Sequence, residues 1–313
     1  MNWWSEFETG ETGLPGGLPG RIECDVPLGR LTWFRVGGSG RFVFHPRDAE
    51  DLSALVRRAR CEDLPIKVLG SGANVLVSDE GFDGVVVRLD HPAFSRVERC
   101  EGGLEVGAGV ELMPLSRRCS EQGLAGLEGL AGIPATVGGA VRMNAGGRFG
   151  DFGSVVSEVE ILRDDGLIER RTHDALRFGY RHGDVGDGIV LSARLALTED
   201  DPHRVKKKFD ECFEYKKASQ PLADRSAGCV FKNPPGASAG ALIDKAGLKG
   251  KVYRGASVSD RHANFIVTEQ GAKASDVLGL IDMVRERVAD VCGVRLELEI
   301  DVWRPAACYA VAS

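Results

Sequence analysis

Residues 124–147 have the sequence LAGLEGLAGIPATVGGAVRMNAGG, and seven of these 24 positions are glycine. Average usage of about 7% would give one or two. Apolar residues lie between the glycines, so this is not a solvated linker. Glycine allows unusual backbone angles or the close approach of another group. Residues 133–139 therefore offer bare backbone N–H groups and the hydroxyl of Thr136, which is the chemistry that a diphosphate requires. A run of tight turns beneath a core explains the same composition.

The bulk composition is that of an ordinary globular protein. The chain has 313 residues, 43% of them hydrophobic and 27% charged, with a formal net charge of −6. This length predicts roughly two or three domains, and the acidic balance gives no electrostatic reason to expect nucleic acid or an anionic membrane as a partner. No apolar run approaches the roughly 18 residues that span a bilayer, and the first residues lack the pattern of a signal peptide. We therefore expect no membrane insertion and a cytoplasmic location.

The eight cysteines are scattered and form no Cys-x-x-Cys pair. This spacing argues against a zinc knuckle or a disulfide framework and for a reducing cytoplasm. We expect no metal site. Seven of the cysteines lie in apolar or helical contexts and are expected to be packing residues or surface thiols, whereas Cys229 lies in a loop.

Hydrophobic periodicity predicts helices mixed with strands, and hence an α+β fold. Residues 9–20 are rich in glycine and proline and are expected to be disordered. The expected strands are residues 31–40 (a short extended run), 41–45, 104–109, 155–162, 189–197, 258–267 and 295–302. One expected helix begins after Asp48, and the others occupy residues 111–122, 204–217, 239–246 and 275–292.

Residues 70–75, GSGANV, are similar to the dinucleotide-binding fingerprint but differ from it in two ways. Val75 stands in place of the third glycine, and the sequence that follows alternates like a strand rather than a helix. Residues 66–78 therefore predict a strand, a loop and a second strand, not a Rossmann unit. The loop either wraps a phosphate with its amides or is a plain hairpin connection.

A candidate anion site lies at the end of the helix expected over residues 204–217. Lys216 and Lys217 come directly before the loop that begins near Gln220, whereas the lysines at 206–208 are expected to form a solvated face.

Two later segments also carry candidate chemistry. Residues 226–234, SAGCVFKNP, place a thiol, an amide and an ammonium in one loop. In the alternating run at 295–302, Glu297, Glu299 and Asp301 share one face. That acidic face either meets solvent or lines a cleft.

Five motifs, in order along the chain from about Leu31 to Asp301, together resemble those of the UDP-N-acetylenolpyruvoylglucosamine reductases. They are residues 70–84 (GSGANVLVSDEGFDG), 132–140 (GIPATVGGA) followed by Asn144 and Ala145, 179–181 (GYR), 226–234 (SAGCVFKNP) and 262–266 (HANFI). The resemblance implies an enzyme that uses NADPH to reduce the enolpyruvyl group of UDP-N-acetylenolpyruvoylglucosamine. Its product, UDP-N-acetylmuramate, is a peptidoglycan precursor, which implies a role in cell wall biogenesis, cell shape and cell division. The short connection at 183–188 is similar to the family branch without an inserted substrate-capping loop.

The resemblance also implies a fold and a cofactor. The fold is of the vanillyl-alcohol-oxidase/PCMH type, with FAD-binding subdomains at residues 21–90 and 91–200 and a C-terminal α+β substrate-binding domain at 201–304. Tails of 1–20 and 305–313 flank them. FAD is expected to bind non-covalently, with NADPH and a UDP-sugar as small-molecule substrates and a monomer or homodimer as the assembly. The implied FAD contacts are Gly70, Ser71, Gly72, Ala73, Asn74, Gly132, Ile133, Thr136, Val137, Gly138, Gly139 and Ala140.

The resemblance implies three catalytic residues. Arg181 would polarise the substrate carboxylate as negative charge builds up on it, and Glu299 would help to hold that enediolate. The family's proton-donating serine is replaced by Cys229, whose reference pKa of about 8.5 keeps it a proton donor. Leu298 stands where the family usually has proline, and lysines stand in the helix where arginines are common. The implied substrate contacts are Tyr180, Lys216, Gln220 and Asn233.

Two other functions fit parts of this sequence. One is an FAD-dependent oxidase of the same fold, and the other is a non-catalytic UDP-sugar-binding protein. The third-domain motifs and Arg181 argue against an oxidase, which needs neither. The presence of both Arg181 and Glu299 argues against a binder that has lost its chemistry.

Overall fold

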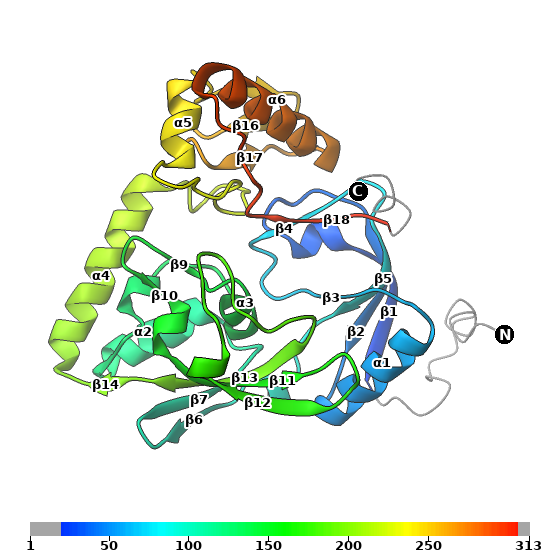
Figure 1. Ribbon diagram of the computed structural model, residues 1–313, viewed down its shortest axis with the longest axis vertical. Coiled ribbons are helices and arrows are strands. Elements are labelled where there is room, and N and C mark those ends of the chain that lie inside the picture. Colours follow the sequence, from blue (N-terminus) through cyan, green and yellow to red (C-terminus); the bar gives the residue numbers. More distant parts are fainter. Residues whose placement is uncertain (1–19, 306–313) are drawn as a thin grey trace. The chain divides into compact units, whose positions relative to one another are not determined.

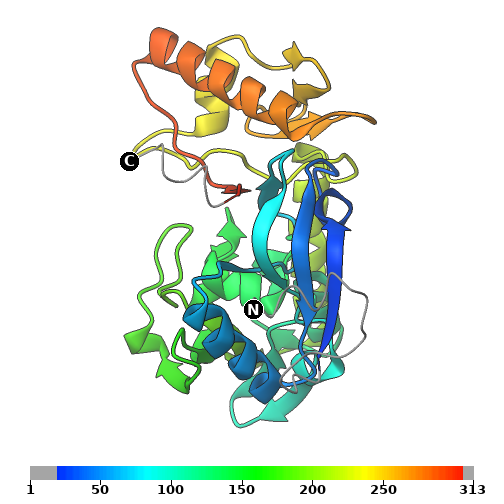
Figure 2. The same ribbon diagram turned by 90° about the vertical axis from the view of Figure 1, so that its right-hand side faces the viewer.

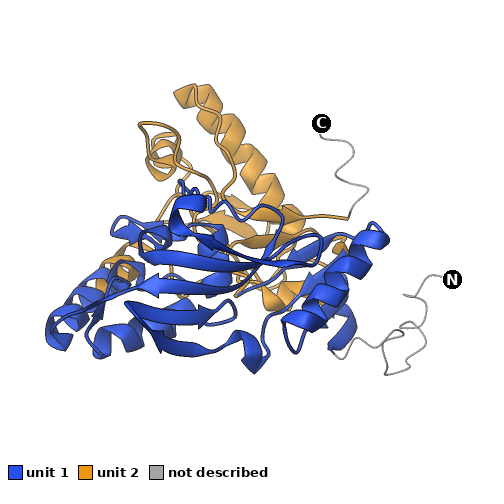
Figure 3. Cartoon of the chain, turned by 60° about the horizontal axis from the view of Figure 1, so that its bottom comes forward, with its two compact units in different colours: residues 1–26, 40–70, 84–213 blue, residues 27–39, 71–83, 214–313 orange. Residues whose placement is uncertain are grey.

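The computed structural model describes residues 20–305, so most of the two predicted tails lies outside the described residues. The chain forms two compact units, each built from several segments (Figure 3). The first unit takes the segments up to Val26, Gly40–Gly70 and Gly84–Phe213; the second takes Pro27–Ser39, Ser71–Asp83 and the chain from Glu214 onward. These units interleave along the sequence, whereas the predicted domains were contiguous. The predicted division into two FAD-binding subdomains and a third domain stays a prediction.

A four-stranded sheet forms one part of the first unit. Its strand order is β1 (Arg21–Pro27), β2 (Ser39–His45), β5 (Phe82–Val87) and β3 (Ile66–Val68), with β3 and β5 parallel. Helix α1 (Ala49–Cys61) lies beside this sheet (Figures 1 and 2) and shares its apolar core. The helix begins as predicted, because the side chain of Asp48 accepts a hydrogen bond from the Asp51 N–H at 2.8 Å.

A five-stranded antiparallel sheet forms the other part of the first unit. Its order is β12 (Ile168–Thr172), β11 (Val156–Leu162), β13 (Ile189–Ala196), β7 (Gly103–Gly107) and β6 (Val97–Cys100). Helix α2 (Leu112–Glu121) follows β7, and the short helix α3 (Val137–Arg142) packs against β13 (Figure 1). Two short pairs complete the unit: β8 (Leu124–Ala125) with β14 (Thr198–Glu199), and β9 (Gly146–Gly147) with β10 (Gly150–Asp151). One continuous hydrophobic core joins the two large sheets.

The second unit has its own core beneath helix α6 (Ala274–Cys292). Helices α5 (Ala239–Lys245) and α6 pack together, and α6 covers a small antiparallel sheet of β15 (Val252–Tyr253), β16 (Ala256–Val258) and β17 (Ile266–Thr268) (Figure 1). A separate parallel pair joins β4 (Val75–Val77) to β18 (Asp301–Trp303). Helix α4 (Pro202–Ser219) has its first residues in the first unit and its last residues in the second.

Asp79 fixes the start of α6 from a distant part of the sequence. Its carboxylate accepts hydrogen bonds from the N–H groups of Ala274 at 2.8 Å and Ser275 at 3.0 Å. Burial works to raise the pKa of Asp79, but the hydrogen bonds from Ser275 and Ala274 outweigh burial and lower it.

Most predicted elements are confirmed, and three are wrong. The extended run predicted at residues 31–40 is absent up to residue 38, because the chain forms a 3₁₀ turn at Leu28–Leu31 and then further turns before β2 begins at Ser39. The strand predicted at 258–267 is two strands, since Ser259 starts a turn in which its N–H bonds the Phe265 carbonyl. Of the strand predicted at 295–302, only the end from Asp301 is regular strand.

The strand–loop–strand interpretation of residues 66–78 is confirmed, but the plain hairpin is wrong. Strand β3 pairs with β5, and β4 pairs with β18, so the two strands around the loop are not partners. The mixed content of helices and strands confirms the α+β class. Within residues 20–305, no helix combines the length and the apolar character needed to cross a membrane.

Candidate active site

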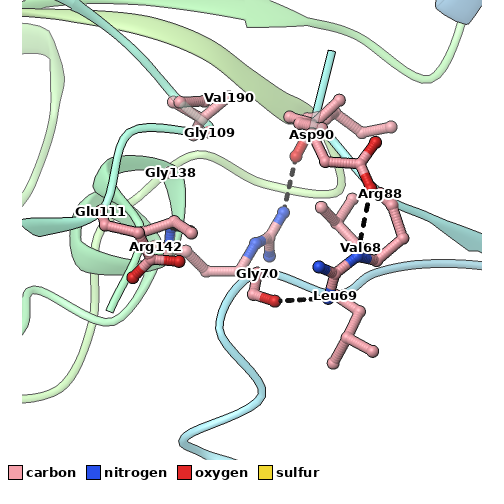
Figure 4. A pocket seen from close by; sticks show the side chains of 16 residues that line it. Val68, Leu69, Gly70, Arg88, Asp90, Gly109, Glu111, Gly138, Arg142 and Val190 are labelled. Atoms are coloured by element: carbon pink, nitrogen blue, oxygen red, sulfur yellow. Dashed lines mark hydrogen bonds and ion pairs between the residues drawn. The ribbon is translucent and has the colours of Figure 1, made fainter. Parts of the chain in front are cut away.

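A cavity of about 130 Å³ lies in the first unit, and every residue that lines it belongs to that unit (Figure 4). Its walls come from the end of β3 with Gly70, the β5 end with Arg88, the β7–α2 connection with Glu111, and the start of α3. Gly188, just before β13, also lines the cavity. Part of the glycine-rich stretch at residues 124–147 therefore does line a cavity.

The glycines of this cavity are there for different reasons. A Cβ atom at Gly70 would lie 2.5 Å from Thr136 Oγ1 and would displace that side chain, and one at Gly138 would lie 3.0 Å from the Ala108 Cβ, which is tighter than an ordinary contact. Packing within the chain therefore disfavours a side chain at both positions. A Cβ atom at Gly139 would meet only Thr136 Oγ1, at an ordinary 3.5 Å. Packing within the chain therefore leaves room for a side chain at Gly139, which is what a surface that receives a ligand would show.

The backbone N–H groups of α3 are not bare, which corrects one expectation from the sequence. Val137 donates to the Val110 carbonyl, Gly138 donates to the Ala108 carbonyl at 2.9 Å, and Ala140 donates to Thr136 at 2.8 Å. The side chain of Thr136 accepts from the Gly139 N–H at 3.4 Å and so caps the helix. These residues therefore offer their surface to a ligand and not free amide donors.

Gly132 and Ile133 do not line this cavity. The Gly132 N–H donates to Met113 Sδ at 3.1 Å, and the Ile133 N–H donates to the Leu130 carbonyl at 3.0 Å. Both N–H groups are used within the fold, so the expectation of a bare N–H at Ile133 is wrong. The FAD contacts expected at Gly132 and Ile133 stay a prediction.

The loop between β3 and β4 has the unpaired amides that α3 lacks. The N–H groups of Gly70, Gly72, Ala73 and Asn74 donate to no other group among residues 20–305, although Gly72 is buried and the other three are half-buried. Such amides must find a partner when they are shielded from water. The Asn74 side chain fixes the loop by donating to the Glu299 carbonyl at 3.2 Å. A run of unpaired N–H groups in one loop suits an anion such as a diphosphate.

Charged side chains that the sequence analysis missed also line the cavity (Figure 4). The Arg88 guanidinium donates to the Gly70 carbonyl at 2.9 Å, and Arg142 donates to the Gly188 carbonyl at 2.6 Å. Both arginines therefore hydrogen-bond to the backbone of the cavity wall. Burial raises the pKa of the Glu111 carboxyl, and the positive charge of Arg88 offsets part of that rise. Only proximity in the fold identifies these residues, because each is isolated in the sequence.

Arg181 occupies a tight turn in the first unit. The His182 N–H donates to the Gly179 carbonyl at 3.2 Å, and the Gly179 N–H donates to the His182 carbonyl at 2.8 Å. Arg181 has a φ of 55°, and its guanidinium lies over the Tyr180 ring, 5.2 Å from the ring centroid. Arg181 is half-buried, whereas 54% of Tyr180 is exposed.

The second unit carries Cys229 and Glu299 on neighbouring backbone segments. The Glu299 N–H donates to the Val230 carbonyl at 2.8 Å, and the Val230 N–H donates to the Asn264 carbonyl at 2.8 Å. The segment with the thiol is thus held between the segments 297–299 and 264–265. The structure brings these two predicted catalytic residues together within one unit.

The three acids of the predicted acidic face have different surroundings. Glu297 has a 79% exposed side chain near Lys232, at 3.9 Å, and Asp301 is exposed and accepts from Trp303 Nε1 at 2.7 Å. Glu299 is half-buried. Burial therefore singles out Glu299, although the alternating pattern could not.

The two lysines of the predicted anion site at the end of α4 differ in exposure, and only Lys216 is buried. Lys216 is 5% exposed, whereas the Lys217 side chain is 64% exposed and lies 3.7 Å from Glu214. The Arg261 guanidinium donates to the carbonyls of Lys217 and Gln220, each at 3.3 Å, and so ends the helix. Asn233, in the loop after Cys229, accepts a hydrogen bond from the Ala239 N–H at 2.9 Å through Oδ1, which holds its side chain at the start of α5.

The cysteines are not all in apolar or helical contexts. Cys24, exposed on β1, is outside both contexts, whereas Cys61 is exposed within helix α1 and so lies in a helical context as predicted. Cys119 and Cys212 are buried, and burial raises the pKa of Cys119 to about 11. All seven described cysteines are free thiols, and Cys308 lies outside the described residues.

Comparison with known proteins identifies the family. A family profile described as UDP-N-acetylenolpyruvoylglucosamine reductase, C-terminal domain, matches residues 220–303, and a profile described as FAD binding domain matches residues 41–171. The UDP-N-acetylenolpyruvoylglucosamine reductase of Heliobacterium modesticaldum is 42% identical over 279 residues, which cover 88% of each chain. This chain belongs to the UDP-N-acetylenolpyruvoylglucosamine reductase family.

Other members of the family agree over nearly the whole chain. The reductase of Caulobacter vibrioides is 38% identical over 304 residues, covering 96% of this chain and 98% of the relative. The crystal structure of UDP-N-acetylenolpyruvylglucosamine reductase from Thermus caldophilus superimposes with a TM-score of 0.80 at 40% identity, covering 91% of this chain and all of that one. These matches confirm the predicted FAD-binding fold of the vanillyl-alcohol-oxidase/PCMH type.

Proposed function

We propose that this protein reduces UDP-N-acetylenolpyruvoylglucosamine to UDP-N-acetylmuramate with NADPH as the electron donor. Family membership supports the reaction. The observation that carries the proposal is the direct backbone link that holds the Cys229 segment against Glu299. A thiol and a half-buried carboxyl on adjacent segments are a proton donor and a group that could stabilise an enediolate.

FAD fits the residues that are present. The unpaired amides of Gly70, Gly72, Ala73 and Asn74 would hold its diphosphate, and the open surface at Gly139 would receive another part of it. When bound, FAD supplies hydride transfer between NADPH and the enolpyruvyl carbon. In this proposal the cofactor is held non-covalently.

The side chains of this chain would supply the charge stabilisation and the proton. Addition of one hydride to the double bond leaves negative charge on the carbon next to the carboxylate and on its oxygens. Arg181 and Glu299 would stabilise that charge, and Cys229 would give its proton to the carbon, after which solvent restores the thiol. Lys216, Gln220 and Asn233 would bind the substrate's diphosphate and neighbouring groups, and Tyr180 would contact the substrate next to Arg181.

Location and physiology follow from this reaction and belong to the same proposal. A chain with seven free thiols in its described part suits the cytoplasm, where UDP-linked precursors are made. Peptidoglycan precursor synthesis would connect it to cell wall biogenesis, cell shape and cell division. Its assembly would be a monomer or a homodimer.

A spectroscopic titration tests the proposal. The purified protein should show the absorbance of bound flavin, which anaerobic NADPH should bleach and the UDP-sugar should then restore in a one-to-one amount. Restoration by oxygen alone would indicate an oxidase. Absence of bound flavin, together with retained affinity for the UDP-sugar, would indicate a binding protein.

A further inference from the structure

The turn that carries Arg181 has a backbone conformation that needs support. Arg181 is the third residue of a β-turn closed by the hydrogen bond from the His182 N–H to the Gly179 carbonyl, and its φ is 55°. A positive φ at this position is normally supplied by glycine. Side-chain-bearing residues keep such angles only where the surrounding structure holds them.

Asn144 provides that support from the end of α3. Its side chain is 4% exposed and makes two hydrogen bonds in opposite senses. Nδ2 donates to the Gly179 carbonyl at 2.9 Å, at the first residue of the turn, and Oδ1 accepts from the buried Gly153 N–H at 2.8 Å. The amide thus joins the Arg181 turn to the segment that leads into β11.

The backbone conformation and the two hydrogen-bond partners of Asn144 suit an amide side chain. Asn144 has a φ of 39°, in the left-handed region where asparagine is several-fold enriched. A Cβ atom at Gly153 would lie 2.9 Å from Asn144 Oδ1 and 2.6 Å from the Phe178 ring, so glycine is required for this approach. The amide donates to one backbone group through its NH₂ and accepts from another through its oxygen, whereas the carboxylate of the isosteric aspartate has no hydrogen to give.

The other side of the turn is fixed from the same helix. The Gly183 N–H donates to the Arg142 carbonyl at 2.9 Å, so residues at the end of α3 hold the chain on both sides of Arg181. We infer that Asn144 is the positioning residue for Arg181, fixing the turn from which its guanidinium reaches the substrate carboxylate. This inference rests on the proposed function for the role of Arg181, but the support of the turn can be measured independently.

The informative substitution is Asn144→Asp, which keeps the acceptor for Gly153 and replaces the donor to Gly179 by a second acceptor. Loss of a buried hydrogen bond raises the population of locally open turns by about tenfold or more. Trypsin should therefore cut after Arg181 about tenfold faster than in the wild type, with cleavage elsewhere in the chain as the reference. Flavin content should stay at the wild-type level. The kcat should fall about tenfold, and in an Arg181→Ala background the same substitution should change the residual kcat by about twofold or less.

Each outcome decides a different point. Unchanged trypsin cleavage after Arg181 would overturn the inference, and so would an equal loss of kcat in both backgrounds. If Asn144→Asp does not fold, Asn144→Gly fits the same φ and removes both hydrogen bonds, and the same measurements apply to it. Wild-type turnover by Arg181→Ala alone would overturn the proposed role of Arg181, while faster cleavage in Asn144→Asp would still show that Asn144 holds the turn.

Discussion

Replacing Gly139 by leucine separates the demands of packing from those of the cofactor. A Cβ atom at this position meets only Thr136 Oγ1, at 3.5 Å. Gly139 lines the cavity of about 130 Å³, so a larger side chain there would take up space in the cavity. Gly138 is a poorer probe, because its Cβ would lie 3.0 Å from the Ala108 Cβ and would disturb the fold itself.

The two expected effects of Gly139→Leu have opposite signs. Removing a glycine from helix α3 should stabilise the cofactor-free protein by about 0.5–1 kcal/mol, or about 1–4 °C in Tm. Overfilling a site that must hold a ligand costs about 1–3 kcal/mol, and every 1.4 kcal/mol is a factor of ten. The Kd for FAD should therefore rise about 5- to 150-fold.

The assay needs both quantities from one preparation. Cofactor-free protein is titrated with FAD to obtain the Kd, and its thermal unfolding is recorded without FAD. Gly147→Leu is the matched control, because a Cβ atom there has no neighbour within 4 Å and Gly147 does not line the cavity. Wild-type affinity for FAD in Gly139→Leu would refute the placement of the cofactor at this wall. Equal loss in Gly147→Leu would mean that bulk alone disturbs the unit.

Three further predictions concern the second unit. Cys229→Ala should lower kcat about 10²- to 10⁴-fold, whereas Cys229→Ser should keep much of the activity. In a background in which the exposed cysteines have been replaced, thiol alkylation should inactivate the enzyme with Cys229 but not the Cys229→Ser variant. Glu299→Gln should slow oxidation of the NADPH-reduced enzyme by the UDP-sugar and leave its reduction by NADPH nearly intact. The control Glu297→Gln should change neither step. Equal damage to both steps in Glu299→Gln would mean a structural role. Asp79→Ala should cost about 0.5–2 kcal/mol of unfolding free energy at pH 7, because α6 loses its cap. Since the folded-state pKa of Asp79 is lowered, that contribution is present above the ordinary carboxyl pKa and is lost as the pH falls through the folded value, so denaturant titrations at low pH should show a smaller difference.

Local sequence signals predicted the helices well and the hydrogen-bond partners poorly. The cap at Asp48 and the glycine after α6, with a φ of 68°, lie next to the elements that they end, so the sequence contains them directly. The amides of Val137 and Gly138 are different. Their partners at Val110 and Ala108 come from another part of the chain, and composition could not show that the glycine-rich stretch already uses its N–H groups.

Two misses have different causes. The segment predicted as one strand at 258–267 contains a turn, and apolar residues on both sides of Ser259 and Asp260 pack into the same core. The sequence therefore showed no sign of the break. Lys216 could have been distinguished from Lys217, since it follows Phe209 and Cys212 at helical spacings of seven and four and so shares their buried face. The charged side chains that line the cavity, Arg88, Glu111 and Arg142, gave no such signal.

The pairing of β4 with β18 has a consequence for biosynthesis. Asn74 and Glu299 are 225 residues apart, so at about 5–20 residues per second the ribosome needs about 10–45 s to make the strand that supports the loop after it has made the loop itself. During that time the unpaired amides of Gly72 and Ala73 have no fixed geometry. With the proposed placement of the flavin, its capture would wait for nearly the whole chain, and a nascent or prematurely terminated chain that lacks residues 301–303 would bind no flavin and would be exposed to proteolysis.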